Sequence, residues 1–235
     1  MTESTLQIQA DFDRLAALDD GEWDHNRHYH AFLLRHLPAR REHALEIGCG
    51  TGAFSRALAA HFDRVTALDL SPEMVHRARE LSRSVENVEF RQADITTCDL
   101  PAASLDCIAI IATLHHLSLD DTLRKLAAAL RSGGVLLVLD LYQPRSIVDW
   151  LWSAWAYPWN LLLRAWHTHQ LREPSHVRQA WSDHARHDVY PTLPEVRSLA
   201  ERLLPGAVVR RHLFWRYSLV WRGEAKCAVD PNLPG

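Results

Sequence analysis

The sequence predicts an α/β protein built on a doubly wound, mostly parallel sheet with helices on both faces. Three observations indicate this class. Short apolar runs alternate with helical runs up to about residue 143, which is typical of parallel sheets. A glycine-rich turn joins the first strand to the first helix, and two β-rich runs follow near the end of the chain. At 235 residues, the chain has the length of one large α/β domain.

The predicted strands of the first half are short and mainly apolar. They are Ala44–Ile47, Arg64–Asp69, Val88–Arg91, Leu105–Ile111 and Val135–Leu139. The fourth run is almost wholly apolar, as expected of a strand that is covered on both faces.

Helical signals separate these strands. A helix that contains Tyr29 should end at Pro38, and the run Phe54–Phe62 follows the glycine turn. Ser71 and Pro72 can begin a helix that continues to Leu81. A further helix is expected to begin after Ser118 and run to Arg131, where Gly133 and Gly134 would end it.

The second half is unusually rich in tryptophan, since eight of the nine fall between Trp150 and Trp221. A helical stretch is expected over Ile147–Gln170, with Trp155, Trp159 and Trp166 on one face. Three interpretations stay open: packing on the sheet, a lid over an apolar acceptor, or a weak peripheral membrane contact. No transmembrane helix is expected, because polar residues interrupt this stretch.

The last elements are a helix and a hairpin. Thr192 and Glu195 form the signature of a capping box, which should begin a helix ending at Leu204. The runs Ala207–Leu213 and Tyr217–Trp221 have only a short connection, so we expect an antiparallel pair at the edge of the sheet.

Composition excludes several classes of protein. Hydrophobic residues make up 47% and charged residues 23% of the chain, which excludes disorder. The net charge of -3 and the lack of a basic stripe make nucleic acid a poor partner. Four cysteines without paired spacing suggest neither a disulfide framework nor a zinc cluster. The chain starts without a secretory pattern, so a cytoplasmic location is expected.

The glycine turn, read alone, fits two cofactors. Three glycines within Glu46–Gly52 let a ligand approach the backbone closely. The pattern Gly48-x-Gly50-x-x-Ala53 with Asp69 further on also matches a dinucleotide fingerprint. Against NAD(P), the chain has no Tyr-x-x-x-Lys pair and only one mononucleotide-binding half. A nucleoside triphosphate loop of the GxxxxGK[ST] type is also missing.

Five motifs in order resemble those of class I S-adenosylmethionine-dependent methyltransferases, and the segment Trp23–Tyr29 resembles the small-molecule, quinone-biosynthesis-like branch of that family. The five motifs are ALEIGCGTGAFS (44–55), VTALDLSPEM (65–74), VEFRQADI (88–95), LDCIAIIATLHHL (105–117) and LRSGGVLLVLDL (130–141). The resemblance implies a Rossmann-like seven-stranded sheet with an antiparallel last strand, here with a helical Trp-rich insertion.

The resemblance also implies which residues hold S-adenosylmethionine. Gly48, Gly50 and Gly52 would pass near its methionine portion, and Asp69 would accept both ribose hydroxyls. The other expected cofactor residues are Tyr29, Glu46, Leu70, Met74, Asp94, Ile95 and Ala112. In the segment before Tyr29, His25 and Arg27 could supply further donors.

Histidines provide the catalytic candidates. His115 follows the fourth strand, beside the point where ligands bind in open sheets. His184, His187 and Asp188 could form a base with its orienting carboxylate. His116, Trp155 and Trp159 are expected to contact the acceptor. No metal is expected, because a closing ligand is missing near residue 188 and no acidic residue directly follows the fourth strand, where Thr113 and Leu114 stand.

These features predict one domain with four parts: a helical cap over residues 1–43, a cofactor-binding core over 44–143, a helical substrate lid over 144–206 and a hairpin over 207–222. The expected activity is methylation of a small hydrophobic or aromatic metabolite, on oxygen. Two alternatives stay open: a cofactor-binding protein of this fold that transfers no methyl group, and an NAD(P)-dependent oxidoreductase.

Overall fold

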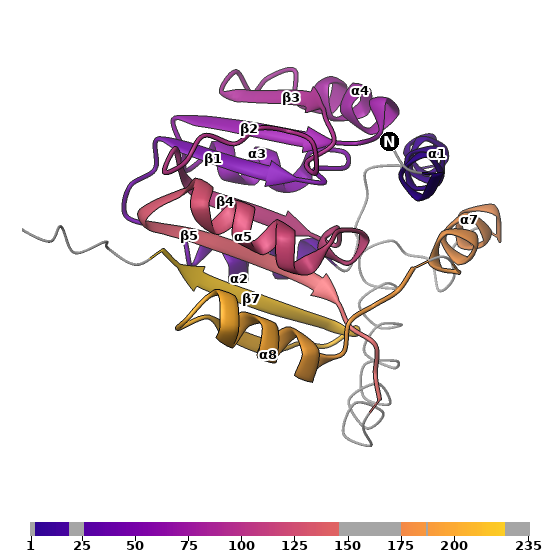
Figure 1. The fold of residues 1–235 in the computed structure, drawn as a ribbon. Coiled ribbons are helices and arrows are strands. Elements are labelled where there is room, and N and C mark those ends of the chain that lie inside the picture. Colours follow the sequence, from indigo (N-terminus) through magenta and orange to yellow (C-terminus); the bar gives the residue numbers. More distant parts are fainter. Residues whose placement is uncertain (1–2, 19–25, 146–174, 187, 224–235) are drawn as a thin grey trace, which may run out of the picture.

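A seven-stranded sheet forms the centre of the protein (Figure 1). The computed structural model describes residues 3–18, 26–145, 175–186 and 188–223. The predicted helix Ile147–Gln170 with Trp155 and Trp159 lies outside the described residues, as do His25 and His187.

The strands run in the order β3-β2-β1-β4-β5-β7-β6. Their bounds are β1 His43–Ile47, β2 Arg64–Asp69, β3 Val88–Gln92, β4 Leu105–Ile111, β5 Leu130–Leu141, β6 Val208–Arg211 and β7 Arg216–Arg222. The first five strands pair in parallel, and β7 is antiparallel to both β5 and β6. The predicted fold class and the C-terminal hairpin are therefore confirmed.

Helices cover both faces of the sheet. They are α1 Glu3–Ala16, α2 His30–Leu34, α3 Ala53–Ala59, α4 Pro72–Leu81, α5 Leu119–Ala129, α7 Ser175–Ala185 and α8 Leu193–Leu203, with 3-10 turns η1 Arg27–Tyr29 and η2 Leu114–His116. Helices α5 and α8 pack on one face of the sheet, while α2, α3 and α4 pack on the other. None of these described helices has both the length and the apolar character needed to cross a membrane.

Period-two alternation explains why both faces are covered. In β4, Ile108 and Ile110 join the core beneath α5, whereas Cys107 and Ala109 join the core beneath α3. All seven residues of β4 are buried. The continuous apolar run in the sequence is therefore the signature of a central parallel strand.

Two features of the structure differ from the prediction. Helix α1 lies within the predicted helical cap over residues 1–43, but its bounds were not predicted; it packs on α4 and α7. The helix after Ser118 does not reach Arg131 but ends at Ala129, because Leu130 is already extended and pairs with Leu105 of β4. Gly133 and Gly134 therefore lie inside β5 and do not terminate a helix, and the register of β4 and β5 shifts in the same region.

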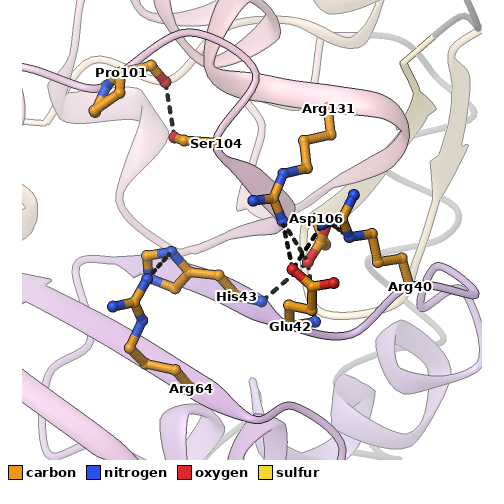
Figure 2. Close-up of polar contacts among 8 residues, drawn as sticks. All are labelled: Arg40, Glu42, His43, Arg64, Pro101, Ser104, Asp106 and Arg131. Atoms are coloured by element: carbon orange, nitrogen blue, oxygen red, sulfur yellow. Dashed lines mark hydrogen bonds and ion pairs between the residues drawn. The ribbon is translucent and has the colours of Figure 1, made fainter.

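A polar network ties together the amino-terminal ends of β1, β4 and β5 (Figure 2). Asp106 accepts hydrogen bonds from the backbone N–H groups of Glu42 and His43, at 2.9 and 3.0 Å. Arg131 donates to both oxygens of the same carboxylate, at 3.0 and 3.1 Å. This edge of the sheet is thus occupied by structural contacts, and the opposite edge carries the residues expected to act.

Candidate active site at the carboxyl-terminal edge of the sheet

The glycine loop after β1 touches the loop after β4. Gly48 has a φ of +70°, and a Cβ atom there would lie 2.0 Å from Thr113 Oγ1. Gly52 has a φ of +78°, and a Cβ atom added there would lie 2.7 Å from the ring of Phe90. Both positions require glycine, because an L side chain would be strained and would also overlap its neighbour. The contact with Thr113 brings the two loops to one place.

Asp69, at the end of β2, faces this loop. Its Oδ2 accepts the Gly50 N–H at 2.7 Å and its Oδ1 accepts the Ser71 N–H at 2.9 Å. Burial raises the pKa of Asp69 to about 6, against the lowering effect of these backbone N–H groups. The carboxylate is therefore fixed in position at the carboxyl end of the sheet, where ligands of such folds bind.

Glu46 lies deeper, at the end of β1. Its carboxylate accepts a hydrogen bond from the Ser55 hydroxyl, which comes from α3. Burial raises the pKa of Glu46 to about 8, so much of the population is protonated at neutral pH. The side chain is therefore placed to fix the glycine loop against the first turns of α3.

Four of the other expected cofactor residues lie at or just beyond the ends of β2, β3 and β4. Leu70 and Asp94 follow β2 and β3, Ala112 follows β4 with a φ of +49°, and Ile95 is buried in the core under α5. Asp94 accepts hydrogen bonds at Oδ1 from the N–H and hydroxyl of Thr96.

Tyr29 belongs to a different environment. It packs with α2 and Phe214, and its hydroxyl donates to the Leu213 carbonyl at 3.0 Å. Burial raises the pKa of Tyr29 to about 12. The structure therefore uses this hydroxyl to join the N-terminal segment to the C-terminal hairpin.

Helix α1 covers the same edge of the sheet. In Figure 1, α1 and α7 lie on the right, beyond the arrowheads of β1 and β2. Met74 is buried against Leu15 and Ala16 of α1, and Ser71 donates a hydrogen bond to Asp13. Helix α1, much nearer the start of the chain than the expected covering segment His25–Tyr29, therefore lies over this edge of the sheet.

A cluster of histidines and carboxylates occupies the space between the loop after β4, α1 and α7. Turn η2 supplies His115 and His116, α7 supplies His184, and the chain leading to α8 supplies Asp188. Ring centroids lie 4.0 Å apart for His115 and His116, and 5.2 Å apart for His116 and His184. The fold therefore unites three of the four expected catalytic residues with the expected substrate residue His116.

The structure pairs a different histidine and carboxylate from those expected near residue 188. His184 Nε2 stands 3.6 Å from Asp188 Oδ2, too far for a hydrogen bond. The carboxylate that orients a histidine is Asp140 at the end of β5, whose Oδ1 lies 2.6 Å from His115 Nδ1. Asp140 also accepts the His115 backbone N–H at 2.8 Å. His115, not His184, is therefore the histidine with a closely bound carboxylate.

Burial controls the charge of this cluster. Burial and the neighbouring His115 lower the pKa of His116 to about 4, although Asp188 acts in the opposite direction. Burial and the hydrogen bond to Asp188 raise the pKa of Tyr190. His116 is therefore a neutral imidazole at neutral pH, and Tyr190 keeps its proton for Asp188.

Several site residues escaped the prediction. Asp140 could have been found, because it is the one acidic residue in the apolar strand run of β5. Tyr190, which donates to Asp188 Oδ2 at 2.7 Å, had no local signal. Asp11 stands 3.4 Å from His184 Nδ1, and Phe12 makes an edge contact with the His184 ring. Both belong to α1, whose bounds within the predicted helical cap were not predicted.

Known proteins share this sequence pattern and fold. A family model described as a methyltransferase domain matches residues 45–138. An uncharacterised methyltransferase of Mycobacterium tuberculosis is 32% identical over 209 residues, covering 86% of this chain and 98% of that protein. A malonyl-[acyl-carrier protein] O-methyltransferase of Paenibacillus is 38% identical over 112 residues, covering 45% of this chain and 40% of its own.

A solved structure shows the same architecture. The N-methyltransferase NodS of Bradyrhizobium japonicum, in complex with S-adenosylhomocysteine, superposes with a TM-score of 0.62 at 20% identity. The match covers 93% of this chain and 99% of that one. At this identity the likeness concerns the fold alone.

Proposed function

The chain belongs to the class I S-adenosylmethionine-dependent methyltransferases, and from this premise we propose that it methylates an oxygen atom of a small hydrophobic or aromatic metabolite. It is an enzyme whose cofactor is S-adenosylmethionine. This membership sets aside the NAD(P) interpretation that the glycine pattern alone left open. The acceptor, its methylated atom and the roles of individual residues are the proposal.

The cofactor is assigned to the carboxylates at the strand ends and to the glycine loop. Asp69 receives the ribose hydroxyls, with two backbone N–H groups holding its oxygens in place. Gly48, Gly50 and Gly52 leave the loop backbone open to the methionine portion, and Glu46 fixes that loop through Ser55. Met74, Asp94 and Ile95 are assigned to the adenosine, with Leu70 and Ala112 beside them.

The observation that carries the oxygen acceptor is the buried polar cluster of His115, His116, His184 and Asp188. Buried polar groups require hydrogen-bonding or ionic partners, and an acceptor oxygen supplies one. The contact of Thr113 with Gly48 supports a position of this cluster next to the glycine loop. Methyl transfer is an in-line displacement in which positioning alone can contribute about 7–11 kcal/mol. The similar proteins include both an O-methyltransferase and an N-methyltransferase, so the choice of oxygen rests on the cluster alone.

Three finer assignments extend this proposal. Trp155 and Trp159 form a lid over the acceptor within residues 144–206, beyond the cofactor-binding core at 44–143. His187 joins the cluster through its neighbour Asp188. The quinone-biosynthesis-like branch describes the class of acceptor, a flat hydrophobic ring with an oxygen substituent.

The experiment offers the purified protein S-adenosylmethionine carrying a labelled methyl group and three sets of acceptors: phenols, carboxylic acids and amines. We expect label in a methyl ether or ester, with stoichiometric S-adenosylhomocysteine. Transfer to amines alone contradicts the oxygen assignment. Tight cofactor binding without any transfer would favour the alternative of a cofactor-binding protein that no longer methylates.

A pair of variants connects the activity to the cluster. Asp188→Ala should reduce kcat by at least about tenfold while the affinity for S-adenosylmethionine stays the same, because the cluster faces the acceptor. Asp183→Ala is the matched control, since this carboxylate lies on α7 but pairs outward with Arg186. Equal kcat in the two variants contradicts the assignment.

A further inference from the structure

The carboxylate of Asp188 is surrounded by imidazole nitrogens at an unusual distance. His116 Nδ1 lies 3.4 Å from Oδ1, while His184 Nε2 and His115 Nε2 lie 3.6 and 3.9 Å from Oδ2. None of the three makes a hydrogen bond to Asp188, whose donor is the hydroxyl of Tyr190. Three imidazole nitrogens therefore converge on this carboxylate without a hydrogen bond to it, and a space remains between the nitrogens and the carboxylate oxygens.

That space has the dimensions of a metal site. Imidazole and carboxylate ligands bind zinc at about 2.0–2.2 Å, so that neighbouring ligand atoms of a tetrahedral ion lie a little over about 3 Å apart. One ligand atom from each of His115, His116 and Asp188 lies within 4.8 Å of the other two. A small closure of these side chains would bring all three into contact with a single ion.

Outer contacts support the same interpretation. Histidines that bind metals commonly donate their second ring N–H to a carboxylate, which fixes the ring and its tautomer. His115 Nδ1 has this contact with Asp140 at 2.6 Å, which directs Nε2 toward Asp188. The side chains of His115, His116 and Asp188 are each at most 8% exposed, so water competes weakly for the ligands.

We propose that His115, His116 and Asp188 bind one divalent first-row transition-metal ion of the zinc type, with the imidazole of His184 next to the site and the fourth position left open. Two imidazoles and one carboxylate suit such ions, whereas magnesium and calcium prefer oxygen ligands throughout. The sequence predicted no metal because the residues near 188 lacked a closing ligand. The fold supplies that ligand from the turn after β4.

The open position of this ion would face the acceptor, and there it would bind the acceptor oxygen as a Lewis acid. This use of the ion rests on the proposed function. The binding of the ion does not, because it depends only on the side chains that form the site. Metal binding and methyl transfer can therefore be tested separately.

The experiment uses the full chain after treatment with a chelator. Zinc chloride is titrated calorimetrically, and cobalt chloride is followed by visible absorption, since cobalt(II) reports four- or five-coordinate nitrogen and oxygen ligation. We expect one equivalent of either ion, a raised melting temperature on binding, and no binding of magnesium at the same concentration.

Variants test the assignment of ligands. His116→Ala and Asp188→Ala should abolish the saturable binding and the cobalt bands. Tyr190→Phe removes only the hydroxyl that holds Asp188 and should weaken binding by about 10–100-fold, as loss of an outer hydrogen bond does. His76→Ala is the control for adventitious surface binding, because His76 lies exposed on α4 next to Glu80; it should leave the stoichiometry unchanged.

Three results would overturn the proposal: no saturable binding of zinc or cobalt, one equivalent retained in both alanine variants, or binding that is lost with His76. If the alanine variants do not fold, Tyr190→Phe decides, and an unchanged affinity in that folded variant contradicts the site. Methyl transfer by a protein that binds no metal rejects the metal site alone. Metal binding without methyl transfer to any acceptor counts against the proposed function and leaves the metal site intact.

Discussion

Gly48 is the residue at which the two loops of the active site meet. Its positive φ favours glycine, and its missing side chain makes room for Thr113. Gly206 shares the positive φ, at +80°, but a Cβ atom there would meet nothing within 4 Å. The two glycines therefore separate the cost of backbone strain from the cost of steric overlap.

We predict that Gly206→Ala lowers the free energy of unfolding by about 1–3 kcal/mol, the usual cost of a strained φ. Gly48→Ala should lower it further and should also weaken binding of S-adenosylmethionine, because Thr113 must move and the loop with it. Urea denaturation and calorimetry measure the two effects. Equal losses of stability in both variants, with cofactor affinity retained, would show that the contact with Thr113 has no role.

The carboxylate of Asp69 gives the second prediction. Asp69→Asn keeps the shape of the side chain but removes its charge, so it should weaken cofactor binding by about 1.5–3 kcal/mol, the range for hydrogen bonds to charged groups. Asp120→Asn, at an exposed pair with Arg124, is the control and should bind the cofactor as the parent does.

The pH dependence of cofactor binding follows from the same group. Burial raises the pKa of Asp69 to about 6, and the ionised carboxylate is the stronger hydrogen-bond acceptor. The affinity for S-adenosylmethionine should therefore fall as the pH drops below about 6. Calorimetric titrations at several pH values check this, and Asp69→Asn should lack this transition. A profile that is the same in both proteins contradicts the assignment.

At the scale of elements, two of the predicted helix starts, at Thr192 and Ser118, behave differently. Thr192 forms a complete capping box on α8: its hydroxyl accepts the Glu195 N–H, and the Glu195 carboxylate accepts the Thr192 N–H. Ser118 also stands at an N-cap, of α5, but its side chain donates to Asp121 and makes no cap hydrogen bond. Two hydroxyl side chains at the same helix position therefore contribute differently to stability.

We predict that Thr192→Ala lowers the free energy of unfolding by about 1 kcal/mol, the typical cost of losing a helix cap. Ser118→Ala should cost clearly less, since no capping bond is removed. Chemical denaturation of both variants measures the difference. A larger loss for Ser118 would mean that its hydroxyl caps α5 in solution.

Across the whole molecule, the two edges of the sheet have separate tasks. The amino-terminal edge is held by Asp106 and Arg131 (Figure 2), and the carboxyl-terminal edge carries Asp69 and the histidine cluster. Parallel strands make this division possible, because every strand presents the same end to the same edge. Changes at the structural edge should therefore leave binding at the other edge unaffected.

Asp106→Asn tests this separation. An amide cannot accept all the hydrogen bonds that the carboxylate takes from two backbone N–H groups and Arg131, so we expect a loss of about 1–3 kcal/mol in the free energy of unfolding. Cofactor affinity should not change. Glu42→Gln, on the exposed side of the same network, is the control and should leave the free energy of unfolding nearly unchanged. A large loss of cofactor affinity in folded Asp106→Asn contradicts the division.

The loss of folding stability at low pH should depend in part on Asp106. Burial alone would raise the pKa of Asp106, but the N–H of His43 and the guanidinium of Arg131 outweigh it and hold the pKa below its ordinary value. A lowered pKa in the folded state means that this contribution is complete above the unfolded pKa, about 3.9, and is lost as the pH falls below it. The free energy of unfolding should therefore differ less between pH 6 and pH 3 in Asp106→Asn than in the parent protein, as measured by chemical denaturation at both pH values.

Local patterns predicted the central fold well. Each of the five early strands was placed within a few residues of its position, because burial on both faces leaves an apolar run that a single segment reveals. The predicted start of β5, at Val135, was wrong. The strand begins at Leu130, because pairing of Leu130 with Leu105 ends the preceding helix. The bounds of helix α1 were not predicted, although Ile8, Phe12, Leu15 and Ala16 recur at the spacing of one helical face.

The sequence by itself determined the α/β class, the glycine loop and the carboxylates at the strand ends, since these depend on local periodicity and on the order of motifs. Only the tertiary structure decided that Asp188 stands between His115, His116 and His184, and that Asp140 supports His115. These contacts join segments far apart in the chain. Their distances depend on how α1, α7 and the loop after β4 pack together, and no short pattern encodes such packing.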